Sequence, residues 1–172
     1  QSPPGSSYNS NGQGVSLLNG PTEFGPRHPA AVQWTKEPAK FARSGDILFC
    51  VRGATTGRKN IADREYCIGR GIAAIRGRDG LAGTDFVWHT LDVVTEAMLG
   101  KAAGSTFINL PGNELNSFPI PLPPLSEQKR IAALLNEQMA AVERARKAAE
   151  EELEAINRLP AALLRRAFAG EL

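Results

Sequence analysis

The sequence predicts an α+β protein in which a β-rich globular domain, residues 1–122, is followed by one long coiled-coil-type helix, residues 123–172. Short apolar runs bounded by turn residues fill the first part of the chain, and such runs are typical of strands. A proline cluster at 119–124 separates this part from the rest. Beyond the cluster, strong helix formers dominate and apolar residues recur every seven positions, which indicates a helix that packs along another helix.

The first domain is expected to contain several short strands. Residues 15–18 and 31–35 lie between loops rich in Gly, Pro and Asn, and we expect a strand at each. Residues 47–51 form a continuous apolar run after a turn, which is typical of a buried strand. We expect two further strands at 72–75 and 107–110.

One amphipathic helix is expected within this domain, over residues 84–100. It would end at Gly100, because glycine is favoured just beyond a helix C-terminus, and Thr84 is a suitable N-cap. The apolar side chains recur at the spacing of one helix face. They are Phe86, Val87, Leu91, Val94 and Met98.

The terminal helix is expected to begin at Ser126, whose hydroxyl can cap it, with Glu127 near the positive end of its dipole. We expect a kink or break at Pro160, which lacks a backbone donor and crowds a carbonyl of the preceding turn. One alternative is that the helix packs along its own domain. The residues expected to face a partner helix are Ile131, Leu135, Val142, Ala145, Ala149, Ile156, Leu159 and Leu163.

Bulk composition excludes several classes of protein. A hydrophobic content of 42% is enough for a core, so wholesale disorder is not expected. The sequence has neither an apolar run long enough to span a membrane nor a secretory signal pattern, and we expect a cytoplasmic location. Cys50 and Cys67 are interpreted as reduced core thiols, and no Cys/His pattern has metal-ligand spacing. We therefore expect no metal and no cofactor.

Common catalytic motifs are absent from the sequence. In the loop 53–59 the glycine spacing is too short for a phosphate-binding P-loop, and the lysine is followed by Asn60 rather than Ser or Thr. The histidines have no acid or nucleophile beside them in sequence, and two carboxylates in a basic stretch suit salt bridges better than catalysis. These residues are His28, His89, Asp63 and Glu65. We expect a protein that is not an enzyme.

Positive charge is concentrated in residues 52–78. This stretch holds seven Arg and Lys residues against two acidic ones, a local excess of +5, whereas the whole chain has a net charge of +2. Such a patch is typical of a phosphate-facing surface, and an ordinary arginine-rich solvent face is the alternative.

Several motifs resemble those of the specificity subunits of type I restriction–modification systems. In the first domain these are the run 45–58, beginning Gly-Asp-Ile-Leu-Phe, and the run 69–76. At the junction they are 113–115 and the run 120–131, which leads from the proline strap (119–124) into the helix, and the ending 163–172 is also typical. The resemblance covers roughly residues 12–172. We expect the family's usual opening strand, ahead of the first glycine-rich loop, to be missing.

The resemblance implies a non-catalytic subunit that binds double-stranded DNA sequence-specifically and brings methyltransferase and nuclease subunits to the site. A full subunit has two recognition domains joined by two antiparallel helices, and this chain shows one of each. We therefore expect half a subunit, either a half-length form that makes a homodimer or a fragment of a longer one. The helix would act as a ruler of roughly 60 Å, close to two turns of duplex.

In that context the basic loop 52–59 and the N-terminal loop are the expected DNA-reading elements. Arginine can reach phosphates or guanine edges, and asparagine can pair with adenine. A competing interpretation is a non-catalytic scaffold whose head binds protein and whose helix dimerises. The residues expected to contact DNA are Tyr8, Asn9, Asn11, Arg27, Arg52, Thr55, Thr56, Arg58, Lys59, Arg70 and Lys101.

Overall fold

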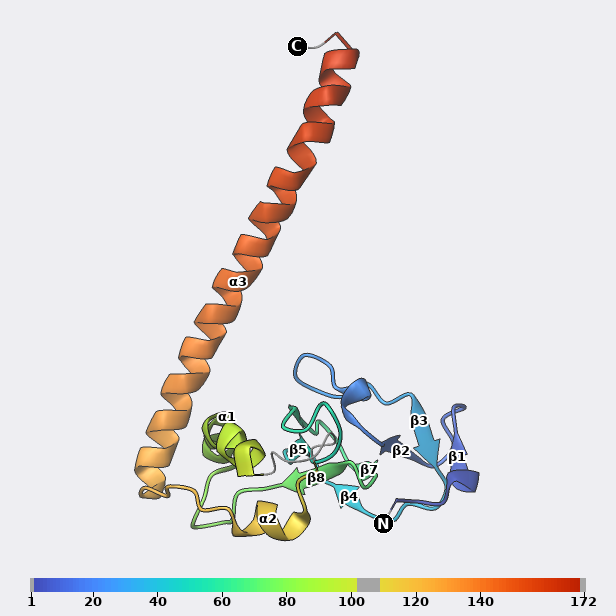
Figure 1. The fold of residues 1–172 in the computed structure, drawn as a ribbon, viewed down its shortest axis with the longest axis vertical. Coiled ribbons are helices and arrows are strands. Elements are labelled where there is room, and N and C mark those ends of the chain that lie inside the picture. The colour runs from blue at the N-terminus through green and yellow to red at the C-terminus, as the bar shows by residue number, and fades with distance from the viewer. Residues whose placement is uncertain (1, 102–108, 171–172) are drawn as a thin grey trace. The chain divides into compact units, whose positions relative to one another are not determined.

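The computed structural model describes residues 2–101 and 109–170, except for the side chain of Lys101, and divides into two compact units, Gln1–Lys129 and Arg130–Leu172. Figure 1 shows its α+β architecture, as the sequence predicts. The strands are β1 (Tyr8–Asn9), β2 (Val15–Leu18), β3 (Gln33–Thr35), β4 (Phe41–Ala42), β5 (Ile47–Cys50), β6 (Lys59–Ile61), β7 (Tyr66–Ile68) and β8 (Ile72–Ile75). The α-helices are α1 (Thr84–Lys101), α2 (Gly112–Ser117) and α3 (Leu125–Phe168), and two short 3-10 helices cover Gly5–Ser7 and Pro21–Glu23.

The first unit contains two small sheets. A five-stranded sheet has the order β1-β3-β2-β7-β4, and a three-stranded sheet has the order β6-β5-β8. β2 and β7 run parallel, and every other pairing between these named strands is antiparallel. β5 is therefore the central strand of the smaller sheet, and the strand from which the loop 51–58 leaves is paired on both sides.

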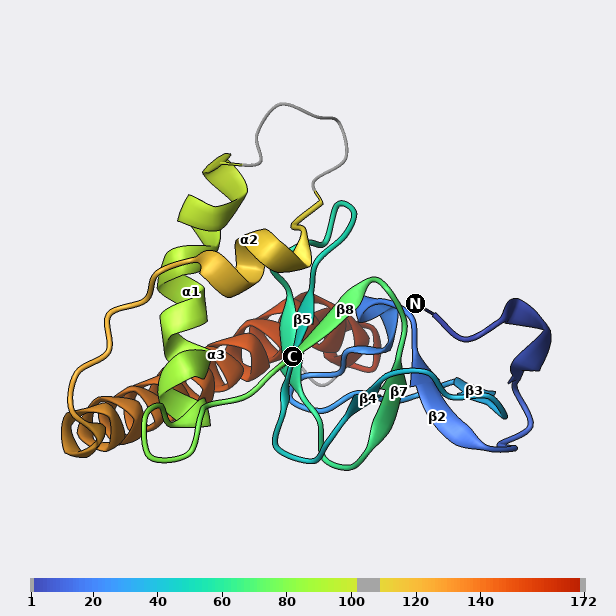
Figure 2. The same ribbon diagram turned by 90° about the horizontal axis from the view of Figure 1, so that it is seen from below.

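β5 has a buried residue at every position because both of its faces are covered. Ile47 and Phe49 belong to a cluster that includes Leu91 of α1. Leu48, which points the other way, packs in a second cluster with Tyr66. Figure 2 shows α1 beside the β5–β8 pair. This two-sided burial explains why the sequence of β5 is continuously apolar instead of alternating.

The expected strands at 15–18 and 72–75 are confirmed with those bounds, and that at 47–51 ends one residue early, at Cys50. Only the last three residues of the stretch 31–35 form a strand. The expected strand at 107–110 lies mostly outside the described residues, although Asn109 forms an isolated bridge. β1, β4, β6 and β7 lie outside the expected strand ranges, and none of them is longer than three residues.

The helix expected at 84–100 is confirmed as α1, although Gly100 does not end it, since both Gly100 and Lys101 are helical. The predicted apolar residues of α1 are buried apart from Val94, which is half-buried. Thr84 is the first helical residue instead of the cap. Its hydroxyl accepts the backbone N–H of Gly77 at 3.0 Å, and the Gly83 carbonyl accepts the N–H of Val87. The short helix α2 was not predicted, because its residues were interpreted as a segment that leads into the proline strap.

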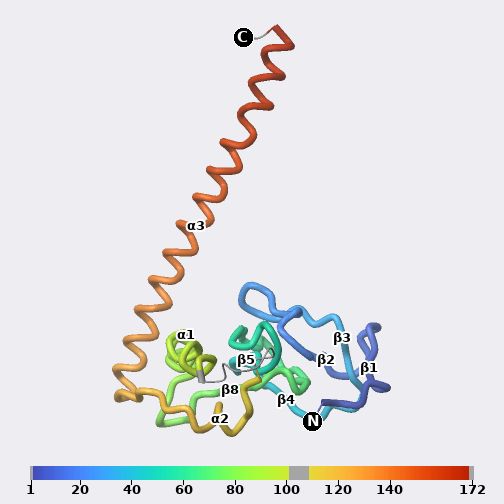
Figure 3. Tube along the Cα trace, viewed as in Figure 1, coloured from blue at the N-terminus to red at the C-terminus, as the bar shows by residue number. Residues whose placement is uncertain are grey.

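The second unit is almost entirely helical. α3 begins at Leu125, so Ser126 lies inside the first turn, and the Pro124 carbonyl accepts the N–H groups of Glu127 and Gln128. The helix continues through Pro160, and Figure 3 traces it without interruption to Phe168. A break at Pro160, one of the two expected outcomes, is therefore wrong, and a kink there stays a prediction.

The carbonyl that loses its partner at Pro160 belongs to Ile156, whose 52% exposure allows water to replace the missing donor. Ion pairs between successive turns also support the solvated helix, at Arg146 with Glu143 and Glu150, Lys147 with Glu151, and Arg158 with Glu154. No helix in the described part of the chain is both long and apolar enough to cross a membrane.

Candidate nucleic-acid interface

The loop between β5 and β6, residues 51–58, has a conformation fixed by its own backbone. The N–H of Thr56 donates to the Gly53 carbonyl at 3.1 Å, and that of Gly57 donates to the Cys50 carbonyl at 2.9 Å. Gly53 and Gly57 have φ values of 84° and 96°, a region that side chains with a Cβ rarely adopt. The predicted reading loop is thus a closed, internally bonded structure.

The side chains of this loop divide into two groups. Thr56 is buried, and its hydroxyl donates to the Gly53 carbonyl at 2.7 Å. Thr55 Oγ1 lies 3.6 Å from the Sγ of buried Cys50. Both threonines therefore support the loop from inside, whereas Arg52 and Arg58 are exposed. Of the predicted contact residues in the loop, these two arginines best suit phosphate or guanine recognition.

The sequence suggested that the side chain of Lys59 extends from the loop toward DNA, but it packs against α1 instead. Its Nζ lies 2.5 Å from a carboxylate oxygen of Asp92, donates to the Trp88 carbonyl at 2.6 Å and sits 4.1 Å from the centre of the Trp88 ring. The side chain is only 12% exposed. Burial lowers the pKa of Lys59, and the hydrogen bond and charge of Asp92 oppose that shift. The ammonium of Lys59 is thus held by residues of α1.

The N-terminal loop shows the same division of roles. The amide of Asn9 donates to the Gln13 carbonyl at 2.8 Å and accepts the Gln13 N–H at 3.0 Å, so this side chain shapes the turn. Tyr8 is half-buried, and its hydroxyl donates to the Pro3 carbonyl at 3.2 Å. Asn11, in the turn that Asn9 closes, is exposed.

Arg27 lies beside β6, the strand that follows the loop 51–58. Its carbonyl accepts the N–H of Ile61 at 3.1 Å, and the neighbouring His28 bonds the Ile61 carbonyl through Nδ1 at 2.9 Å. The amide of Asn60 donates to the Gly25 carbonyl at 2.8 Å. Three hydrogen bonds thus hold the exposed Arg27 next to β6, although 30 or more residues separate them.

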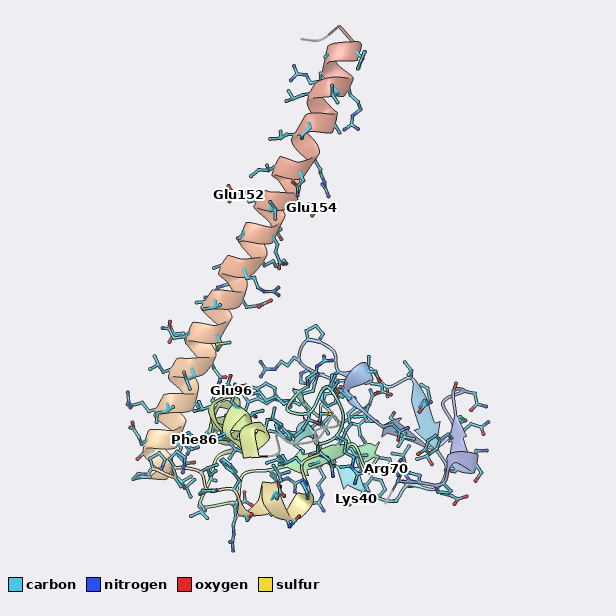
Figure 4. All side chains as sticks on the ribbon, viewed as in Figure 1. Lys40, Arg70, Phe86, Glu96, Glu152 and Glu154 are labelled. Atoms are coloured by element: carbon cyan, nitrogen blue, oxygen red, sulfur yellow. The ribbon has the colours of Figure 1, made fainter. Side chains whose placement is uncertain are left out.

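Tyr8 and Arg70 meet in a second place. Together with Ser2 and Asn19 they line an open hollow of about 570 Å³. Arg70, labelled in Figure 4, is exposed. Arg70 lies in the turn between β7 and β8. The sequence did not predict that it lies near Tyr8, because only the folded sheet brings these two distant segments together. The side chain of Lys101 lies outside the described residues.

Arg76, counted in the basic stretch, is committed to an ion pair that the sequence did not suggest. Its Nε and Nη2 donate to the two carboxylate oxygens of Asp46 at 2.5 and 2.7 Å. Asp46 is 2% exposed and also accepts the N–H of Arg43 at 2.8 Å. This two-point pairing fixes the turn before β5 and raises the pKa of Arg76. Arg76 therefore contributes less to the basic surface than its charge suggests.

A hydrogen bond holds the carboxylate of Asp63, for which a salt bridge was expected. Asp63 accepts the Tyr66 hydroxyl at 2.6 Å, and this bond lowers the pKa of Asp63. Cys50 and Cys67 are free and buried, as expected of core thiols. Within the described residues, no cluster of three or more His, Cys, Asp or Glu side chains could hold a metal ion.

The chain is similar to known proteins of one family. Residues 31–155 match the type I restriction modification DNA specificity domain. A protein of Methanocaldococcus jannaschii, named as the MjaX type I restriction enzyme specificity subunit, is 42% identical over 135 residues, which are 78% of this chain and 32% of that protein. This chain therefore spans about a third of the curated relative.

Solved structures show the same relationship. A chain from a structure describing complex assembly and conformational transition of the type I R-M system is 39% identical, with a TM-score of 0.81 over 100% of this chain and 43% of that one. The HsdS subunit of Thermoanaerobacter tengcongensis is 41% identical, with a TM-score of 0.72 over 100% of this chain and 42% of its own. The S subunit of M. genitalium, at 19% identity and a TM-score of 0.54 over 83% of this chain and 36% of its own, shares the fold. This chain belongs to the family of type I restriction–modification DNA specificity domains.

Proposed function

We propose that this chain is a DNA-recognition half of a type I specificity subunit, which reads one half of a split target and carries no catalysis of its own. The family match supports DNA recognition in general. The observation that supports the reading surface most is the internally bonded loop 51–58, from which Arg52 and Arg58 extend while its threonines face inward. A preorganised loop of this kind loses little conformational entropy when it binds.

Within this proposal, α3 is a spacer and a dimerisation element. Its 44 residues span about 66 Å at about 1.5 Å per residue. Val142, Ile156, Leu159 and Leu163 are each more than half exposed, which is unusual for large apolar side chains that recur along one helix. Their heptad spacing suits a second helix of the same kind, from a second copy or from the other half of a longer subunit.

The methyltransferase and nuclease subunits are the further partners in this proposal. The specificity subunit would bring them to the DNA site by contacts on the helix and on the flanks of the first unit. The relatives come from type I restriction systems, which supports partners of these classes.

Binding to duplex DNA as a function of salt tests the proposed function. The affinity should fall steeply as salt rises. The logarithm of the association constant should decrease with the logarithm of the salt concentration by a slope of about 0.9 for each neutralised phosphate. Arg52→Ala and Arg58→Ala should each weaken binding. A uniform loss with a slope smaller by about one indicates a phosphate contact, and a relaxed preference at one base pair indicates base readout.

Arg43→Ala is the matched control, because Arg43 is an exposed arginine of the same unit that lies outside both the loop and the basic stretch 52–78. If the unmodified chain shows no duplex binding at low salt, the protein-binding scaffold with a dimerising helix replaces this proposal.

A further inference from the structure

One stripe of α1 lies against the second half of the reading loop. Trp88, Asp92, Thr95 and Leu99 are spaced by four, three and four residues, so they share one face of the helix. Lys59 contacts the first two, through the Trp88 ring and carbonyl and the Asp92 carboxylate. A Cβ on Gly57 would lie 2.7 Å from the Thr95 side chain and 3.6 Å from Leu99.

We propose that Lys59 and Asp92 are positioning residues that hold the loop 51–58 against α1 in the conformation required for DNA recognition. This inference rests on the proposed function. It assigns to Lys59 an indirect role in place of a phosphate contact, and to an acidic residue a favourable role in binding a polyanion. The contacts of Lys59 with Trp88 and Asp92 are called the brace. Lys59 directly follows Arg58, so the brace acts next to a proposed DNA contact.

The contacts of Lys59 leave its charge little freedom to reach a ligand. Three groups of α1 hold the ammonium at short range: a carboxylate, a carbonyl and an aromatic ring. A cation over an indole ring in a desolvated site is held more firmly than one in water. Moving Lys59 to a phosphate would break all three contacts and would leave the Trp88 carbonyl without this donor. The geometry therefore keeps the lysine in place when DNA binds.

The sign of the Asp92 effect separates positioning from simple electrostatics. The Asp92 side chain is 60% exposed. If charge alone mattered, Asp92→Asn would remove a negative charge near a DNA-binding loop and would tighten binding. If the carboxylate holds Lys59 and thereby the loop, the same substitution weakens binding. Glu96→Gln, one turn further along α1 at an exposed position that Figure 4 labels, is the matched control for charge.

The experiment selects bound sequences from a pool of randomised duplexes and then compares the dissociation constants for the selected and the random duplex. For Asp92→Asn and Lys59→Met we expect the dissociation constant for the random duplex divided by that for the selected duplex to fall by about fivefold to a hundredfold, the range of one well-placed arginine–guanine contact. Lys59→Arg, which keeps a cation for the carboxylate and the ring, should largely retain discrimination. Titration with excess DNA gives the active fraction, so partial unfolding is not counted as lost affinity.

A spectroscopic readout follows the brace without DNA. In a Trp34→Phe background Trp88 is the remaining tryptophan, and removal of the ammonium from its ring should change its emission in Lys59→Met and Asp92→Asn but not in Glu96→Gln. The inference is overturned if Asp92→Asn binds as tightly as the unmodified chain and selects the same sequences. A lack of DNA binding by the unmodified chain overturns the proposed function itself, and the role of the brace with it.

Discussion

Gln128 is expected to be among the most sensitive polar side chains of the first unit. It lies in the first turn of α3 and is 1% exposed. Its Oε1 accepts the N–H of Gly83 at 2.9 Å, and its Nε2 donates to the carbonyls of Leu81 and Pro123 at 2.9 and 2.8 Å. One amide thus joins three segments: the loop before α1, the proline strap and the start of α3.

Gln128→Leu keeps a side chain of similar size and removes all three hydrogen bonds. Each bond contributes about 1 kcal/mol net, and the three backbone groups remain where water has little access, so we expect a loss of about 2–4 kcal/mol. For a unit of this size, 1 kcal/mol corresponds to roughly 3–4 °C in melting temperature, which gives a fall of about 6–16 °C.

Gln128→Glu should be harmful in a pH-dependent way. It keeps the acceptor for Gly83, but it places a carboxylate against two carbonyl oxygens. The folded-state pKa of the introduced carboxyl is therefore raised above its unfolded value of about 4.3. Stability is retained below that unfolded value, where the protonated group can donate to one carbonyl, and it is lost as pH rises through the folded pKa.

Thermal unfolding followed by circular dichroism at several protein concentrations provides the assay, since concentration dependence separates folding from dimerisation. Gln13→Leu is the control, because the Gln13 side chain is exposed and the bonds found for this residue use its backbone. A melting temperature for Gln128→Leu within about 2 °C of the control would refute the reasoning, since it would mean a change in stability below about 1 kcal/mol.

Three further expectations concern the loop, a buried phenol and the terminal helix. Gly57→Ala, which has both a φ of 96° and a 2.7 Å clash, should lower the melting temperature more than Gly12→Ala, which has a φ of 82° and open space; equal effects would contradict the close packing on α1. Tyr66 should titrate near its pKa of about 12, raised first by burial and then by its carboxylate partner, so the stability that its neutral form provides is present below about 10 and lost as pH rises toward 12. Absorbance titration and denaturant unfolding at alkaline pH check this, and loss of the pH dependence in Tyr66→Phe is required. Val142→Lys should shift the chain from dimer to monomer in light scattering while Ala140→Lys, on the opposite helix face, should not; a dimer that survives Val142→Lys would exclude this seam.

Much of the fold could be predicted from local pattern. The continuous apolar run of β5, the apolar spacing of α1 and the helix-forming composition of α3 are each long enough to identify the element from neighbouring residues. Short strands such as β7 carry no such signal, although β7 occupies an interior position of the larger sheet. The break expected at Pro160 failed because an exposed helix can lose one hydrogen bond to water at small cost.

The amino-acid order alone was enough to identify a loop rich in arginine and a long helix with a heptad seam, since both are properties of neighbouring residues. Only the folded structure shows which cationic side chains of that region are exposed and can contact a ligand. Lys59 bonds a carbonyl 29 residues away and Arg76 bonds a carboxylate 30 residues away, so packing between distant segments commits these charges while Arg52 and Arg58 stay exposed. Folding decides this because an ion pair depends on distance in space, which separation along the chain does not specify.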